Sequence, residues 1–295
     1  MAKNWSRQQS AIEYLTTYGW AILVIMVVFA ALIQLGVFNS FFAPRAQAGS
    51  CTVLRPVGTS TITSISLQGV CNGELPQFVA QYATATSYIA VSGGGAIQVT
   101  PNTPLTFTFW INDNNAGQQQ VILEKANEYA VCAAGTSTKL TDLHSHSAVI
   151  STSMTKNQWY FFAVTLSTPA SGGSNTVTVY INGASQGSAN IGNWAPTTGD
   201  TSSLYLGYNG VSACSSTTTF NGEMANVQMY NAALSAGAVQ TLYLEGIGGA
   251  PIELQNLTAW WPLNGDTQDY GGNNKFGQPS RIIYTTQWSS GYATP

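Results

Sequence analysis

An uncharged apolar segment near the amino terminus constrains this chain more than any other feature. No Asp, Glu, Lys or Arg occurs between Glu13 and Arg45, and most of the intervening residues are Val, Ile, Leu, Phe, Met or Ala. A helix of about 20 such residues is long enough to cross a bilayer. The segment therefore predicts a long apolar helix that begins in a membrane.

The predicted helix is longer than a membrane span requires. Over residues 10–42 it would measure about 50 Å at 1.5 Å per residue, against a hydrocarbon core of roughly 30 Å. Between Tyr18 and Phe38 only Gln34 interrupts its apolar surface, and a helix that is apolar all round is buried in lipid or among other helices. Each large apolar side chain gains about 1.5–3 kcal/mol on full burial. Packing against copies of the same helix is therefore strongly favoured.

Two simpler interpretations of this segment stay open. A secretory signal would use Lys3 and Arg7 as its basic region and Ala46-Gln-Ala48 as its cleavage site, but its apolar region should be only 7–15 residues long. A solitary anchor leaves Glu13 unexplained, since an acidic side chain at membrane depth costs about 2.5–3.5 kcal/mol unless it finds a partner. Assembly would supply that partner.

The motifs Gln9-Ser-Ala-Ile-Glu-Tyr-Leu15 and Tyr18-Gly-Trp-Ala-Ile-Leu23 resemble the class III signal peptide of archaeal type IV pilins. The resemblance covers about residues 3–38. It implies that the chain is made in the membrane and then polymerises through its apolar helix into an extracellular filament. Copies of the same chain would be its main partner.

The same resemblance implies roles for three residues. A membrane prepilin peptidase would cut between Gln8 and Gln9, and Glu13 would then neutralise the new amino terminus of a neighbouring subunit as it docks. The family usually has Gly or Ala before the cut, whereas this chain has Gln8. An uncleaved chain is therefore the alternative outcome.

The sequence after the apolar segment predicts β-structure. Residues 105–111 alternate between apolar and polar side chains and predict a half-buried strand, whereas residues 159–166 are apolar on both faces. Residues 176–181 end at Asn182-Gly183, a strong hairpin signal. Ser235 is expected to cap a short helix over 236–244 that Gly246 closes. Further strands are predicted at 78–82, 88–91, 121–125, 184–188, 204–208 and 223–230.

The order of these segments resembles a laminin-G-like, concanavalin-like jelly roll over about residues 75–245. The matching pieces are Phe107–Ile111, Trp159–Val164, Val179–Gly183, Leu204–Gly207 and Phe220–Ser235. Trp260–Asn274 resembles the segment that usually opens such a domain, yet it lies near the end of the chain. Because chain termini often lie close together, permutation is tolerated, and we expect residues 257–295 to complete the sheets as a permuted terminal strand rather than to begin a second copy.

The expected fold is therefore a long N-terminal hydrophobic α-helix followed by an all-β jelly-roll sandwich. The expected parts are a basic leader (1–8), the pilin-type helix (9–42), a linker and disulfide-bearing segment (43–74) and the jelly-roll domain (75–295).

Charge and cysteine content limit the partners and the compartment. The chain has nine Lys and Arg residues and twelve Asp and Glu residues. Because it has no basic patch that would neutralise phosphates, we do not expect nucleic acid as a partner. All four cysteines follow the apolar segment, which indicates disulfides in an oxidising exterior. Sequence proximity favours Cys51 with Cys71 and Cys132 with Cys214, but the other two connectivities and four free thiols remain alternatives.

Acidic and amide side chains cluster near the carboxyl terminus, at Asp266, Asp269, Asn273 and Asn274. Closely spaced oxygen ligands suit Ca²⁺, which is the one cofactor that the sequence raises. The alternative is a glycine-rich turn whose side chains bind backbone amides.

Other candidate sites are weaker. His144 and His146 lack a third zinc ligand, and the aromatic residues Trp110, Trp194, Tyr205 and Tyr208 either stack on sugars or pack in the core. Gly183-Ala-Ser-Gln-Gly187 matches Gly-x-Ser-x-Gly but lies in a predicted hairpin, not at a strand-to-helix elbow. No Glu-x-Asp-x-x-Glu strand is present, and Glu124 and Glu128 are not placed as a catalytic pair, so we do not expect an enzyme. Asn256-Leu-Thr258 is a glycosylation sequon.

These observations predict a structural subunit of an extracellular archaeal pilus-like filament, with the helix in the filament core and the jelly roll on the surface for adhesion to surface glycans. The alternative is a membrane-anchored carbohydrate-binding adhesin whose helix only tethers the head.

Overall fold

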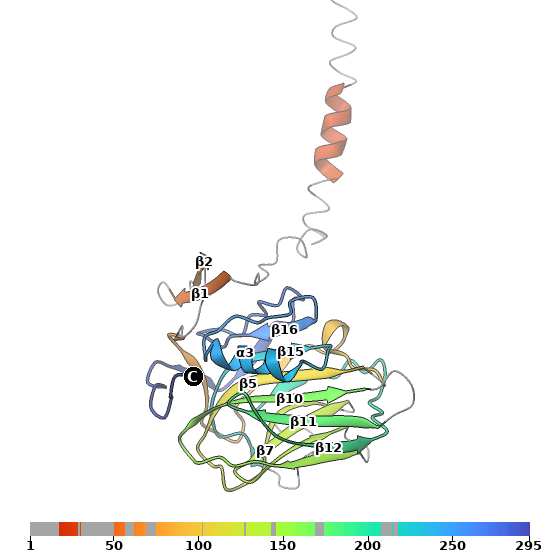
Figure 1. Ribbon diagram of the computed structural model, residues 1–295. Helices are drawn as coiled ribbons and strands as arrows, with labels where there is room; N and C mark the ends of the chain where they lie inside the picture. The colour runs from red at the N-terminus through yellow and green to blue at the C-terminus, as the bar shows by residue number, and fades with distance from the viewer. Residues whose placement is uncertain are drawn as a thin grey trace, which may run out of the picture. The chain divides into compact units, whose positions relative to one another are not determined.

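The computed structural model describes residues 18–28, 30, 50–56, 62–68, 75–101, 103–126, 128–142, 146–168, 174–207, 214 and 218–295 (Figure 1). The chain divides into two compact units, Met1–Ala43 and Pro44–Pro295.

In the first unit, residues 18–28 are helical and all of them are exposed. Trp20, Ile22 and Met26 have the largest exposed fractions of the segment, between 61% and 69%. The helix predicted over 9–42 is thus described only over this stretch, and Gln8, Gln9 and Glu13 lie outside the described residues. Within the part of the chain that the structure describes, no helix has the length and apolar character that a membrane crossing requires.

The segment predicted as a linker contains a hairpin. β1 (Ser50–Pro56) pairs with β2 (Ile62–Gln68) in antiparallel register to form a separate two-stranded sheet. The alternation of polar and apolar residues in Ser64-Ile-Ser-Leu-Gln68 is its signal. Cys71 lies outside the described residues, so its pairing with Cys51 stays a prediction.

The rest of the second unit is a sandwich of two eight-stranded sheets. The first sheet has the order β12-β11-β10-β5-β15-β3-β18, and β16 also pairs with β15. The second sheet has the order β17-β4-β13-β6-β7-β8-β9, and all its pairings are antiparallel except that of β14 with β6. This is the two-sheet jelly roll that the sequence predicts.

The strands of the first sheet are β3 (Val79–Tyr82), β5 (Leu105–Asp113), β10 (Trp159–Ser167), β11 (Asn175–Ile181), β12 (Ala184–Gly192), β15 (Gly222–Tyr230), β16 (Leu257–Trp261) and β18 (Ile282–Thr285). Those of the second sheet are β4 (Tyr88–Val91), β6 (Gln120–Lys125), β7 (Tyr129–Ala134), β8 (Ser137–Thr141), β9 (Ser147–Ser151), β13 (Leu204–Leu206), β14 (Thr218–Thr219) and β17 (Gly277–Ser280). A 3-10 helix, η1 (Gly95–Ile97), follows β4. The β11–β12 turn is the predicted Asn-Gly hairpin, with φ of 50° at Asn182 and 76° at Gly183.

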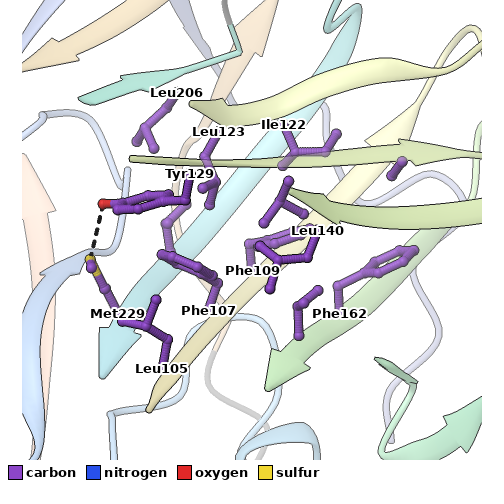
Figure 2. Close-up of a cluster of buried hydrophobic side chains, with 14 of the residues drawn as sticks. Leu105, Phe107, Phe109, Ile122, Leu123, Tyr129, Leu140, Phe162, Leu206 and Met229 are labelled. Carbon is purple, nitrogen blue, oxygen red and sulfur yellow. Dashed lines mark hydrogen bonds between the residues drawn. The ribbon is translucent and has the colours of Figure 1, made fainter. Parts of the chain in front are cut away.

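Alternate side chains of the two sheets meet in one core. Figure 2 shows Phe107 and Phe109 of β5 facing Tyr129 of β7 and its neighbours, and the Tyr129 hydroxyl donates to the Met229 sulfur at 3.7 Å. Phe109 also stacks on Phe162 with ring centroids 5.5 Å apart. Because every inward position on these strands is fully buried, the hydrophobic effect fixes the register of both sheets.

A second apolar cluster covers the outer face of the first sheet. Trp110 of β5 packs against Phe161 of β10, Tyr243 of α3 (Ala236–Leu244) and Tyr292 near the chain end. Figure 1 shows α3 lying over β15 and β5, and the helix starts at the predicted cap, where Ser235 Oγ accepts from the Ala238 amide. The prediction of a half-buried strand at 105–111 was wrong, because this layer buries β5 on both faces.

The carboxyl-terminal segment contributes to both sheets. β17 pairs with β4 at the edge of the second sheet, whereas β16 and β18 pair with β15 and β3 of the first. Farther on, the Trp288 carbonyl accepts from the Trp159 indole at 2.7 Å. Residues 257–292 therefore belong to the same sandwich.

A disulfide joins the outer face of the second sheet to a distant segment. Cys132 of β7 is bonded to Cys214, with their Cα atoms 5.9 Å apart, and both contact Val121 of β6. The bond closes a long loop, since its partners are 82 residues apart.

Removing this disulfide should destabilise the domain without changing its fold. A Cys132→Ser, Cys214→Ser double variant is expected to lose about 2–4 kcal/mol of unfolding free energy, because its unfolded chain is less constrained. Urea denaturation followed by tryptophan fluorescence measures this loss. Equal stability of the variant and the parent would show that the bond contributes nothing.

Candidate functional site

The outer face of the second sheet is only partly covered. Cys214 packs over β6 and β7, while β13, β4 and β17 lie on the other side of β6. In β4, Ile89 and Val91 point into the core, so Tyr88 and Ala90 point outward. On this side of β6, the described outer face consists of the outward residues of three neighbouring strands.

The pairing register defines which residues share this face. Tyr205 of β13 lies opposite Ala90 of β4, and Ala90 lies opposite Gln278 of β17. We call the resulting surface the tyrosine face and define it by its outward members, Tyr88, Ala90, Ser92, Ser203, Tyr205, Phe276, Gln278 and Ser280.

Aromatic rings dominate the tyrosine face. Tyr88 and Tyr205 are both half-buried, and their ring centroids lie 5.6 Å apart in an edge-to-face arrangement. Phe276 just before β17 is 41% exposed. A tyrosine presents an apolar ring with a hydrogen-bonding tip. This face can therefore contact an apolar surface and bond to hydroxyl groups at the same time.

A buried ion pair fixes the loops beside the tyrosine face. Lys125 and Glu128 are fully buried and form a salt bridge, and Lys125 Nζ also donates to the Asp200 carbonyl at 2.9 Å. Gln98 Nε2 donates to the same carbonyl at 2.7 Å, and Glu128 Oε2 accepts from the Val99 amide at 3.0 Å. The pair thus connects β6 to the loops that follow β4 and precede β13.

The two glutamates considered for catalysis are both fully buried. Burial raises the pKa of Glu128, although its bonds to Lys125 and Val99 oppose this shift. Glu124 is also fully buried, on β6 opposite Tyr205. Neither carboxylate is exposed to a substrate.

The acidic cluster near the carboxyl terminus binds the backbone. Asp269 Oδ1 accepts from the amides of Trp260 (3.0 Å) and Gly271 (2.8 Å), and its Oδ2 accepts from Lys275 N at 2.9 Å. Asn273 Nδ2 donates to the Thr258 carbonyl at 2.9 Å.

The other two members of the cluster also fit a turn. Asp266 accepts from the Gln268 amide (3.1 Å) and the Tyr270 hydroxyl (3.0 Å), and Asn274 has a positive φ of 56°. These bonds fit the turn interpretation of the cluster better than the calcium interpretation. Among the described residues, no group of three or more His, Cys, Asp or Glu is placed to hold a metal ion.

The remaining candidate residues are buried, partly buried, or outside the residues that the structure describes. Trp110 and Trp194 are fully buried, which agrees with the core-packing alternative, while Tyr208 and His144 lie outside the described residues. His146 Nδ1 lies 2.6 Å from Asp142 Oδ2. Of the three described aromatics in this set, Tyr205 is half-buried on the outer face of the second sheet.

The sequon at Asn256 lies where β16 begins. Asn256 Nδ2 donates to Glu253 Oε2 at 3.2 Å, and the buried Thr258 hydroxyl donates to the Met229 carbonyl at 2.9 Å. Glycosylation at Asn256 stays a prediction, and attachment would have to precede folding because the hydroxyl that defines the sequon is buried.

Comparison with known proteins identifies the family. Residues 83–240 match the concanavalin A-like lectin/glucanases superfamily. The chain belongs to this superfamily. The disulfide and the lectin-like fold indicate an extracellular or secreted domain.

Solved structures share the superfamily fold at low sequence identity. A candidate carbohydrate-binding protein from Bacteroides ovatus is 16% identical with a TM-score of 0.55, over 78% of this chain and 64% of that one. The chain thus spans about 64% of the length of that relative. A heptameric SAP-like pentraxin from Limulus polyphemus is 14% identical with a TM-score of 0.48, over 72% and 95% of the two chains. No curated protein matches the chain in sequence.

Asp266 predicts a pH dependence of stability. Burial raises its pKa above the ordinary value, although bonds from Gln268 and Tyr270 oppose the shift. The folded state therefore takes up a proton at a higher pH than the unfolded state, and its unfolding free energy should rise as the pH falls through the raised pKa toward 3.8.

Comparison with Asp266→Asn isolates this effect, because the variant lacks the titrating group. Thermal denaturation between pH 7 and pH 4 should show that the parent gains stability relative to the variant as the pH falls. Parallel profiles for the two proteins would contradict the assignment.

Proposed function

We propose that this protein is a surface-displayed carbohydrate-binding protein whose superfamily domain binds sugar through the tyrosine face. The pair of half-buried tyrosines on the outer face of the second sheet carries the proposal. The superfamily to which the domain belongs includes lectins, and this membership adds support.

The chemistry of the tyrosine face suits sugars. A pyranose ring has apolar C–H faces that pack on aromatic rings and equatorial hydroxyls that require hydrogen-bonding partners. Tyr88 and Tyr205 supply rings with polar tips, while Gln278 and Ser280 on β17 supply donors and acceptors beside them. Because the sheet register fixes all these side chains, binding costs little ordering of the protein.

The apolar amino-terminal segment supports display at a membrane surface. Every described residue from 18 to 28 is exposed in the single chain, including the large apolar side chains of Ile25 and Val27. Lipid or other apolar helices must cover such a surface. As a simple tether, this segment would make the protein a membrane-anchored adhesin.

The same exposed segment favours a second function, that of a pilus-like filament subunit. The motif from Gln9 to Leu15 and its resemblance to archaeal type IV pilins favour cleavage after Gln8 and packing of the helices in a filament core. In that form the sugar-binding domains would coat the filament. The two functions differ in what covers the helix and share the tyrosine face.

Sugar binding is tested by removing both rings. Tyr88→Ala, Tyr205→Ala is expected to lower the affinity of the full-length protein for the glycans it binds on a glycan array at least tenfold, about 1.4 kcal/mol. Isothermal titration with the strongest array ligand measures the change.

The control for this experiment is Tyr160→Ala. Tyr160 is also partly buried, but it lies on β10 of the first sheet. If the double variant binds as tightly as the parent, the tyrosine face is not the binding site.

The filament function is tested at Glu13. Glu13→Ala removes the carboxylate that would pair with a neighbouring amino terminus, so membrane insertion should be unchanged while filaments disappear. Electron microscopy of surface material, together with the mass of the extracted chain, distinguishes the outcomes. Filaments of normal abundance in the variant would remove Glu13 from the assembly mechanism.

A further inference from the structure

The tyrosine face has two separate aromatic contact points. Gly277 lies opposite Val91, so Phe276 comes level with Ser92, four residues along β4 from Tyr88. At about 3.3 Å per residue, this separation corresponds to roughly 13 Å. A single sugar ring cannot contact both points.

The outward side chains between these two contact points are small. Along β4 they are Ala90 and Ser92, and beyond them the strand continues into Gly93-Gly94-Gly95. A Cβ at Gly93 would lie 2.0 Å from the Ser202 carbonyl oxygen, and Gly94 has a φ of 87°, so these positions require glycine. These glycines therefore let the backbone of Thr201 and Ser202 pack closely against the end of β4.

The same surface carries no charge. Residues 88–92, 203–205 and 276–280 include no Asp, Glu, Lys or Arg. Lys275 and Arg281 flank residues 276–280 in the sequence. Lys275 Nζ lies only 3.2 Å from the position that a Cβ would take at Gly95. Glu124 beside Tyr205 is buried. An acidic polymer would find no cation in the middle of the face.

We infer that the tyrosine face binds an internal stretch of a neutral polysaccharide chain, with the tyrosine pair as one contact point and Phe276 as a second. This inference rests on the proposed sugar binding and adds the length and charge of the ligand. The chain lies across Ala90 and Ser92, where small side chains leave room, and Gln278 bonds to its hydroxyls.

A chain-length series with the full-length protein tests this inference. The probes are linear glucan, xylan, mannan and galactan oligosaccharides of two and six units, measured by isothermal titration. The six-unit form of the preferred sugar should bind at least tenfold more tightly than the two-unit form. Phe276→Ala should remove most of this difference and leave two-unit binding unchanged, whereas Tyr205→Ala should weaken both.

Two further variants keep the result interpretable. Ser92→Arg adds bulk and charge between the contact points at an exposed position, and it should weaken six-unit binding even if Phe276→Ala fails to fold. Ile283→Ala removes an apolar side chain that is 56% exposed on β18 of the first sheet, and it should change nothing.

The outcomes separate this inference from the proposed function. If two-unit and six-unit sugars bind equally and Tyr205→Ala weakens both, the extended site is wrong and the sugar-binding function stands. Preferential binding of polygalacturonate or dextran sulfate that disappears between 50 and 300 mM salt would overturn the neutral ligand. If none of these four sugars binds but a glycan-array ligand does, the inference fails and the proposed function stands; if no array sugar binds either, both fail.

Discussion

The inward packing of alternate side chains from two facing sheets is the interaction on which the rest of this structure depends. Ile89 and Val91 of β4 and Leu204 and Leu206 of β13 are all completely buried in the shared core. A shift of either strand by one residue would place these side chains in water. Their burial therefore forces Tyr205 and its partner on β4 outward, so the core determines which residues form the candidate site.

Different elements pack on the outer faces of the two sheets. On the first sheet, α3 and the chain end around Trp288 cover a row of aromatic side chains. On the second sheet, the described Cys214 packs on the part around Val121. The edge strand β17 contains Pro279, which lacks an amide donor and so discourages pairing with another strand. The tyrosine face is thus a surface that neither the helix nor the disulfide covers.

Much of the sandwich could be predicted from sequence because its central strands alternate strongly. The strands around Phe107, Phe162 and Val179 and the capped helix after Ser235 all lie where the patterns place them. β7, β8 and β9 were missed because β7 is mostly small residues, while β8 and β9 are mostly Ser, Thr and Lys with few large apolar residues. The burial of Trp110 was missed for a different reason, since it depends on α3 and the chain end, which are distant in sequence.

The candidate site was less predictable than the fold. Tyr205 could be named from its type, but its contact with Tyr88 arises from the pairing of β13 with β4 across more than a hundred residues. Phe276 joins the same surface only because the carboxyl-terminal segment supplies an edge strand. The acidic cluster around Asp269 looked like a cation site, whereas its oxygens accept backbone amides that no sequence pattern displays. Long-range strand pairing and hydrogen bonds to the backbone therefore determine the features of the site that the sequence pattern does not predict.

Hydrogen exchange followed by mass spectrometry tests the central claim most directly, because it locates bound sugar without altering the protein. The full-length chain would be compared with and without a saturating neutral oligosaccharide selected by glycan array. Our account predicts slower exchange in peptides that cover residues 88–95, 203–207 and 276–280, with no change in β11 or β12. Protection confined to residues 184–192 or 266–274, with the tyrosine face unchanged, would contradict it.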